Sequence, residues 1–143
     1  MSFNITVKGI DGLVKQFDKL DKGLDNFSKP LKLADQYLNR EIQKNFSTEG
    51  STLSDGWSPL APSTIKRKKG GKMLVDSGKM KKSFQSQLTR MRLVISNPTE
   101  YFKYHQSSKS RKRLPRRQML GLKQQQVKTI NKFFGAYIKT LFK

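Results

Sequence analysis

Apolar residues in the N-terminal third of the chain recur every three or four positions, which predicts two amphipathic helices. Asp11 is a suitable cap for the first helix. The second helix is expected to start near Ser28 and Pro30, because a proline in the first turn removes no hydrogen bond. Both helices are expected to pack their apolar stripes on a sheet or on each other. The stripes consist of Leu13, Val14, Phe17, Leu20 and Leu24 in the first helix and of Leu31, Ala34, Leu38, Ile42 and Phe46 in the second.

Alternation of apolar and polar residues predicts strands in other parts of the chain. It occurs in residues 3–7, and again in residues 83–88 and 91–97, which lie so close together that they predict a β-hairpin. The aromatic-rich residues 99–106 are expected to form another extended segment. A short capped helix is expected within residues 76–84, where the hairpin region begins.

Neither period is present in residues 47–75, which are rich in serine, threonine, glycine and proline and therefore predict a long irregular loop. Loops of this length in a compact domain are usually functional or become ordered on a partner. Trp57 lies in the middle of the loop, followed by Pro59 and Leu60. We interpret these three residues as an anchor of the loop, either on the core of the same molecule or in an interface, since tryptophan is enriched at binding hot spots.

A third amphipathic helix is predicted over residues 122–143. Its apolar stripe is wider than one intramolecular contact requires, so we expect part of it to lie in the core and part in a contact between subunits. The residues of this predicted interface are Phe133, Phe134, Tyr137, Ile138 and Leu141.

Together these elements predict a single α+β domain, in which two N-terminal helices and a C-terminal helix pack on a small, mostly antiparallel sheet. Its successive regions are a strand and two helices (1–46), the long irregular loop (47–75), a short helix and hairpin (76–106), a basic loop (107–121) and the C-terminal helix (122–143).

Charge is distributed unevenly along the chain. The net charge is +20, yet residues 1–60 carry eight lysines and arginines and eight acidic residues. Residues 61–143 carry 22 basic and two acidic residues, so this half is expected to meet a polyanion or an acidic protein surface. Whether the densest cluster meets DNA, an acidic protein or solvent alone stays open at this point. This predicted basic contact surface consists of Lys109, Arg111, Lys112, Arg113 and Arg116.

Catalytic and metal-binding patterns are missing from the sequence. There is no cysteine and His105 is the only histidine, which excludes sites built on cysteines or histidine clusters. We interpret His105 as a strand residue that forms local hydrogen bonds. No nucleophile motif, P-loop or apolar run of membrane-spanning length is present. The N-terminus lacks the layout of a signal peptide, so we expect a non-enzymatic protein without metal or cofactor, made in the cytoplasm.

Five short motifs in a fixed order resemble the phage virion morphogenesis, or tail completion, family. They cover about residues 43–122. Two positions depart from the family pattern, with Ser107 where a glycine commonly follows His-Gln and Arg116 where an alanine commonly follows proline. The matching residues are Phe46, Glu49, Gly50, Trp57, Pro59, Leu60, Thr64, Lys66, Leu74, Ser77, Gly78, Met80, Ser83, Tyr101, His105, Gln106, Pro115, Arg117, Leu120 and Gly121.

The resemblance implies a non-enzymatic structural protein at the head–tail junction of a virion, assembled in the host cytoplasm. Such proteins complete the tail or neck and work as rings, often of six copies. The implied neighbours are a connector, a tail terminator or a tail tube, with DNA in the channel as a further candidate and no membrane. The resemblance also implies structural roles for the matched residues: Trp57, Pro59 and Leu60 pin the loop, Gly78 permits a turn, and Pro115, Arg117, Leu120 and Gly121 form a junction into the last helix.

The alternative hypothesis is a protein that binds nucleic acid without regard to sequence. The basic C-terminal half would contact phosphates, which is the general basis of non-specific binding. No recognised nucleic-acid-binding module is evident in the sequence, and the aromatic residues are too dispersed to predict a stacking platform.

Overall fold

The computed structural model describes residues 10–69, 71–109 and 111–143, so the strand predicted for residues 3–7 lies outside the described residues. The fold class is α+β, as predicted. The elements in chain order are α1 (Ile10–Leu24), α2 (Ser28–Ser47), α3 (Pro62–Lys68), α4 (Lys79–Lys82), β1 (Gln85–Leu88), β2 (Leu93–Ser96), α5 (Phe102–Gln106) and α6 (Gln124–Leu141).

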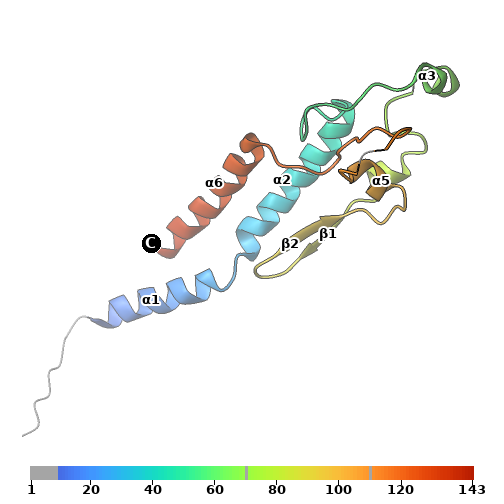
Figure 1. Ribbon diagram of the computed structural model, residues 1–143. Coiled ribbons are helices and arrows are strands. Elements are labelled where there is room, and N and C mark those ends of the chain that lie inside the picture. Colours follow the sequence, from blue (N-terminus) through green and yellow to red (C-terminus); the bar gives the residue numbers. More distant parts are fainter. Residues whose placement is uncertain (1–9, 70, 110) are drawn as a thin grey trace, which may run out of the picture.

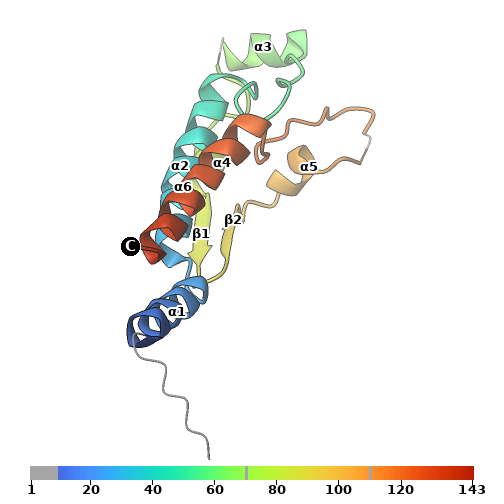
Figure 2. The same ribbon diagram turned by 90° about the vertical axis from the view of Figure 1, so that its left-hand side faces the viewer.

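The molecule is elongated and built around α2 (Figure 1). Helix α6 runs along one side of α2, and the β1–β2 hairpin lies on the other side (Figures 1 and 2). Helix α1 packs on α6 at one end, and α3 lies at the opposite end. All three long helices were expected to pack on the sheet. In the structure α2 does so, whereas α6 packs mainly on α2 and α1 packs mainly on α6.

The hairpin is a two-stranded antiparallel sheet in which Gln85 pairs with Ser96 and Leu88 pairs with Leu93. Its turn is closed by a hydrogen bond from the Thr89 N–H to the Arg92 carbonyl. The N–H of Phe27, at the α1–α2 junction, donates to the Arg90 carbonyl at 2.7 Å, so the tip of the hairpin is tied to the α1 end of the molecule.

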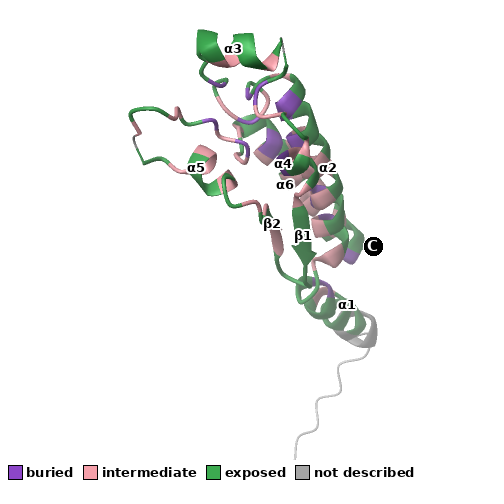
Figure 3. Ribbon diagram, turned by 90° about the vertical axis from the view of Figure 1, so that its right-hand side faces the viewer, coloured by how far each residue is buried: buried purple, intermediate pink, exposed green. Residues whose placement is uncertain are grey.

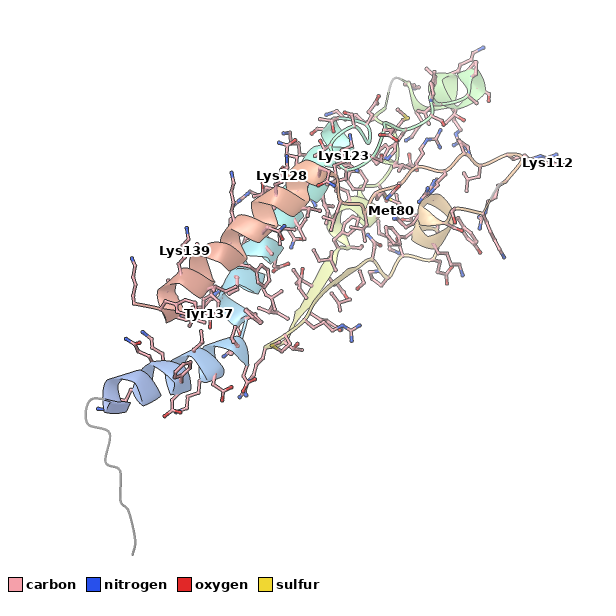
Figure 4. The ribbon with its side chains drawn as sticks, turned by 60° about the vertical axis from the view of Figure 1, so that its left-hand side comes forward. Met80, Lys112, Lys123, Lys128, Tyr137 and Lys139 are labelled. Atoms are coloured by element: carbon pink, nitrogen blue, oxygen red, sulfur yellow. The ribbon has the colours of Figure 1, made fainter. Side chains whose placement is uncertain are left out.

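Aromatic side chains attach α6 to the N-terminal helices. The Phe134 ring lies 5.6 Å from that of Phe27, and the Phe133 ring meets Tyr37 edge-on at 6.0 Å. The single O–H of Tyr137 is shared between the carbonyls of Gly23 and Asn26, which lie 3.0 and 2.8 Å away, and it closes the α1–α2 corner (Figure 4). A buried apolar body with a bonded polar tip is the arrangement that tyrosine favours.

Buried residues gather around the C-terminal half of α2, α4 and the segment that leads into α6 (Figure 3). This core lies at the end of α2 that is distant from α1, where the loop that follows α2 folds back over α2. Its members are Ile42, Phe46, Leu53, Trp57, Met73, Met80 and Met119.

Two local predictions were wrong. Residues 47–75 are not irregular throughout, since α3 begins at Pro62, a residue pre-set for the first helical turn, although it has no buried residue of its own. Residues 99–106 are not extended, because α5 occupies most of them. The Phe102 N–H donates to the Thr99 carbonyl and starts this helical turn, which places the Phe102 ring edge-on to Phe84 at 5.8 Å.

Candidate functional site

The side chain of Asn45 connects three segments at the end of α2. It has no exposed surface, and its Oδ1 accepts a hydrogen bond from the Leu53 N–H at 2.9 Å. Its Nδ2 donates to the carbonyls of Gln118 and Met119 at 3.5 and 3.4 Å. Since a buried amide is stable only when its polar atoms are bonded, Asn45 holds both the loop and residues 118–119 against the helix.

Gln106, the last residue of α5, forms hydrogen bonds to the same segment, at residues 119 and 120. Its Oε1 accepts from the N–H groups of Met119 and Leu120 at 2.9 and 3.0 Å, and its Nε2 donates to the Leu120 carbonyl at 2.7 Å. One side-chain amide thus replaces a strand partner for this stretch of backbone. The Met119 side chain that it positions is completely buried.

Trp57 completes the cluster from the loop. Its indole N–H donates to the Gln118 carbonyl at 2.8 Å, and its ring meets Phe46 edge-on at 5.5 Å. Gly50, with φ of +91°, lies so close that an added Cβ would be 2.3 Å from the indole. The indole therefore fills the space above a glycine on the turn that follows α2.

Arg117 is a buried cation, only 6% exposed. Its Nε donates to the Ser58 carbonyl and its Nη2 to the Pro59 carbonyl, both at 3.0 Å, and its own N–H donates to the His105 carbonyl. Burial lowers the pKa of its guanidinium. We call Asn45, Trp57, Gln106 and Arg117, together with residues 118–121, the hub.

The glycines near the hub are constrained by space or by backbone angle. A Cβ at Gly121 would be 2.6 Å from the Leu53 carbonyl oxygen, so only glycine fits the present packing. Gly78 has φ of +75° immediately before α4, a backbone region that glycine adopts at low cost. Leu120 packs against the core, and Pro115 lies at the outer end of the segment that enters it.

Residues 107–109 and 111–113, which we call the crest, extend from α5 away from the body, with Lys112 at the tip (Figures 2 and 4). Lys109, Lys112 and Arg113 are exposed. Arg111 is half-buried, with its guanidinium carbon 4.5 Å from the centroid of the Tyr104 ring. The predicted basic surface is therefore mixed, because Arg111 is also packed on an aromatic ring and Arg116 donates to the Gln106 carbonyl at 3.2 Å.

A cleft of about 490 Å³ separates α3 from residues 113–117. Arg67, Lys68, Arg113 and Arg117 line it, whereas Asp76 is the one carboxylate among the described residues of its lining. Leu60, Leu74 and Leu114 supply apolar walls. Sequence patterns did not indicate that Arg67 and Lys68 lie near the crest, since the two regions are about forty residues apart along the chain.

His105 faces the same cleft from α5. Its Nδ1 is buried and has no hydrogen-bond partner among the described residues. Since His105 also lies in a helix, the prediction of a strand residue with local hydrogen bonds was wrong. Burial, and to a smaller extent the charges of Arg117 and Arg111, lower the pKa of its imidazole. The neutral form is therefore favoured in the folded protein.

Sequence reasoning missed two buried polar residues. Asn45 and Gln126 occupy positions on the apolar stripes of α2 and α6, three and four residues from Ile42 and Ile130. Gln126 is 2% exposed and donates to Glu41 at 2.8 Å, which joins α6 to α2. For both residues, the one sequence feature that could have indicated burial was a polar side chain at a position on an otherwise apolar helix face. Gln106 and Gly50 were part of the recognised motifs, but no role had been assigned to them.

The arrangement offers binding surfaces and no recognisable catalytic constellation among the described residues. No group of three or more histidine, cysteine or acidic residues suited to a metal ion occurs in the part of the chain that the structure describes. In that same part, no helix combines the length and apolar character needed to cross a membrane.

The sequence profile of the phage virion morphogenesis family matches residues 10–139. No curated protein and no solved structure matches the chain significantly. The match includes α1, the hub, the crest and most of α6, so it extends well beyond the motifs between residues 43 and 122. The chain belongs to the phage virion morphogenesis family, and its role lies in the structure and assembly of the virion.

Proposed function

We propose that the protein is a structural component of the head–tail junction, where a ring of copies, six being expected, caps the tail or joins it to the head. Its neighbours would be a connector, a tail terminator or a tail tube. The site of action would be the virion, after assembly in the host cytoplasm.

The observation that carries this proposal is the contrast between the two ends of the elongated molecule. The end formed by α3, α5 and the crest exposes many cations and few acidic residues. The opposite end exposes apolar side chains, with exposed fractions of 60% for Phe17, 58% for Met91 and 67% for Phe142. The exposed cations are Lys66, Arg67, Lys69, Lys72, Lys103, Lys109, Lys112, Arg113 and Arg116.

Contacts between copies are expected at the apolar end. Copies that each carry a net charge of +20 repel one another, so they associate best where charge is balanced and apolar surface is available. Helix α1 meets both conditions, because its exposed Lys15, Lys19 and Lys22 alternate with aspartates and Phe17 lies among them. Two different patches, Phe17 with Phe142 and the hairpin tip with Met91, would form a head-to-tail contact, which closes into a ring when the rotation permits.

The cationic end is then directed at a neighbour of opposite charge. Lys128 and Lys139 extend the positive surface along α6, on the side away from the hairpin (Figure 4). An acidic ring protein would be steered toward such a surface, and exposed charges chiefly set the encounter rate and its salt dependence.

Binding of DNA is the competing hypothesis. The exposed cations suit phosphates, but of the two exposed tyrosines at this end, Tyr101 and Tyr104, the ring of Tyr104 is flanked by Arg111 and by Lys103, whose Nζ lies 5.1 Å from the ring centroid. The ring is thus less available for stacking on a base, which favours an acidic protein as the partner.

Electron microscopy of the purified protein, alone and mixed with tails or with DNA, tests the proposal. We expect rings, or added density at one end of tails. Protein that coats DNA and leaves tails unchanged would overturn the proposal in favour of the nucleic-acid hypothesis.

A further inference from the structure

The cleft between α3 and residues 113–117 is a recess rather than an exposed surface. We propose that it binds an acidic peptide segment of a partner protein, with a carboxylate held by Arg67, Arg113 and Arg117. This inference rests on the proposed junction role and deepens it, because it places the docking point in the cleft, of which the crest residue Arg113 forms part of the lining.

Arg117 is already oriented for such a ligand. The Ser58 and Pro59 carbonyls fix its guanidinium, while its Nη1 has no hydrogen-bond partner among the described residues and the side chain lines the cleft. The planar guanidinium matches a carboxylate with two parallel hydrogen bonds. Because its rotamer is fixed before the ligand arrives, little further conformational entropy is lost on binding.

Arg67 and Arg113 approach from opposite walls. Both are exposed, and neither side chain forms a hydrogen bond to another described residue. Lys68, in contrast, donates to the carbonyls of Lys72 and Val75 at 3.0 and 3.2 Å, so it stabilises the wall. The three arginines outweigh Asp76, and the recess therefore favours an anion.

The walls favour a peptide over DNA. Leu60, Leu74 and Leu114 line the cleft beside the arginines, and its volume of about 490 Å³ is enough for a few side chains. A duplex carries its phosphates on a convex surface and has no apolar group there to cover these leucines. A segment with alternating acidic and apolar side chains satisfies both parts of the lining.

A second copy of this chain is a poorer ligand than a different, acidic protein. The aspartates of α1 lie next to lysines, as described above, and each copy carries a net charge of +20. An occupant with an unbalanced negative charge must therefore come from another chain.

The test is the fluorescence anisotropy of a labelled peptide of repeated Glu-Leu-Asp-Gly, titrated with the full-length protein and with two variants. Arg67→Gln combined with Arg113→Gln removes two charges from the cleft. Lys66→Gln combined with Lys112→Gln removes two charges from the same helix and the same loop, outside the lining. We expect the cleft variant to bind about tenfold more weakly, equivalent to the loss of one good charged contact. The control variant is expected to lose about twofold at most, as is usual for exposed charges.

Equal weakening in both variants would overturn the inference, because net charge alone would then explain binding. A short DNA duplex that binds more tightly than the peptide and depends on the same two arginines would also overturn it, in favour of a phosphate site. Thermal unfolding of both variants should match that of the parent, since the replaced side chains make no hydrogen bonds to described residues. Density at tail ends together with equal weakening would reject the cleft and leave the junction role intact.

Discussion

The hub and the crest are neighbours in sequence, yet their surroundings are opposite. Gln106 and Arg117 use their polar groups on backbone carbonyls and N–H groups inside the molecule. Lys109, Lys112 and Arg113, which lie between them in the chain, remain exposed. A positive charge therefore does not by itself determine what a residue in this part of the chain does. Apart from Arg117, which also lines the cleft, the hub residues are expected to determine folding, and the crest residues are expected to determine association.

Removing the indole of Trp57 should have the largest effect on stability. Trp57→Ala loses the packing on Phe46 and the hydrogen bond to Gln118, and should lower the free energy of unfolding by about 3–5 kcal/mol. Urea unfolding followed by circular dichroism measures this, since Trp57 is the only tryptophan and its fluorescence is lost. Trp57→Phe keeps a ring without the donor and should lose less. A loss below about 1 kcal/mol for the alanine variant would show that the loop is held by other contacts.

Filling the space beside the hub should have the next largest effect. Gly121→Ala places a Cβ against the Leu53 carbonyl and should destabilise the protein by about 1–3 kcal/mol. Gly135→Ala is the matched control, because nothing lies within 4 Å of its Cβ position in α6. There alanine should raise stability by up to about 1 kcal/mol through helix propensity. Equal melting temperatures for the two variants would contradict the tight packing at Gly121.

Acidification should destabilise the fold through His105 by a smaller amount. Its pKa is lowered in the folded state, so the unfolded chain binds the proton first as the pH falls. This stability is fully present above the pKa of the unfolded histidine, about 6.5, and is lost as the pH falls through the lower pKa of the folded state. His105→Gln should flatten the dependence of the unfolding free energy on pH in this window. An unchanged slope would assign the dependence to other groups.

Neutralising the crest should have the smallest effect on stability. Replacing Lys109, Lys112 and Arg113 with glutamine should change the free energy of unfolding by no more than about 0.5 kcal/mol, because exposed charges contribute little to folding. Urea unfolding of this triple variant beside the parent provides the measurement. A loss comparable to that of Gly121→Ala would mean that the crest is part of the folded core.

The sequence predicted much of the fold and less of the site. Helical periods located α1, α2 and α6, and alternation located the hairpin, because each reflects a repeating local environment. Helix α5 was missed because its position depends on Phe102 packing against Phe84, a contact between distant residues. Asn45 and Gln106 were missed as structural residues because their hydrogen bonds go to backbone groups far along the chain, which no spacing reveals. The cleft was missed for the same reason, because it places α3 opposite residues 113–117, which are distant along the chain.

The most direct test of the separation between folding and association uses the triple crest variant in a phage that produces this protein. The measured quantity is the fraction of particles with joined heads and tails, counted by electron microscopy. A variant as stable as the parent that leaves heads and tails unjoined is the predicted result. A normal fraction of joined particles would contradict a role of the crest in association.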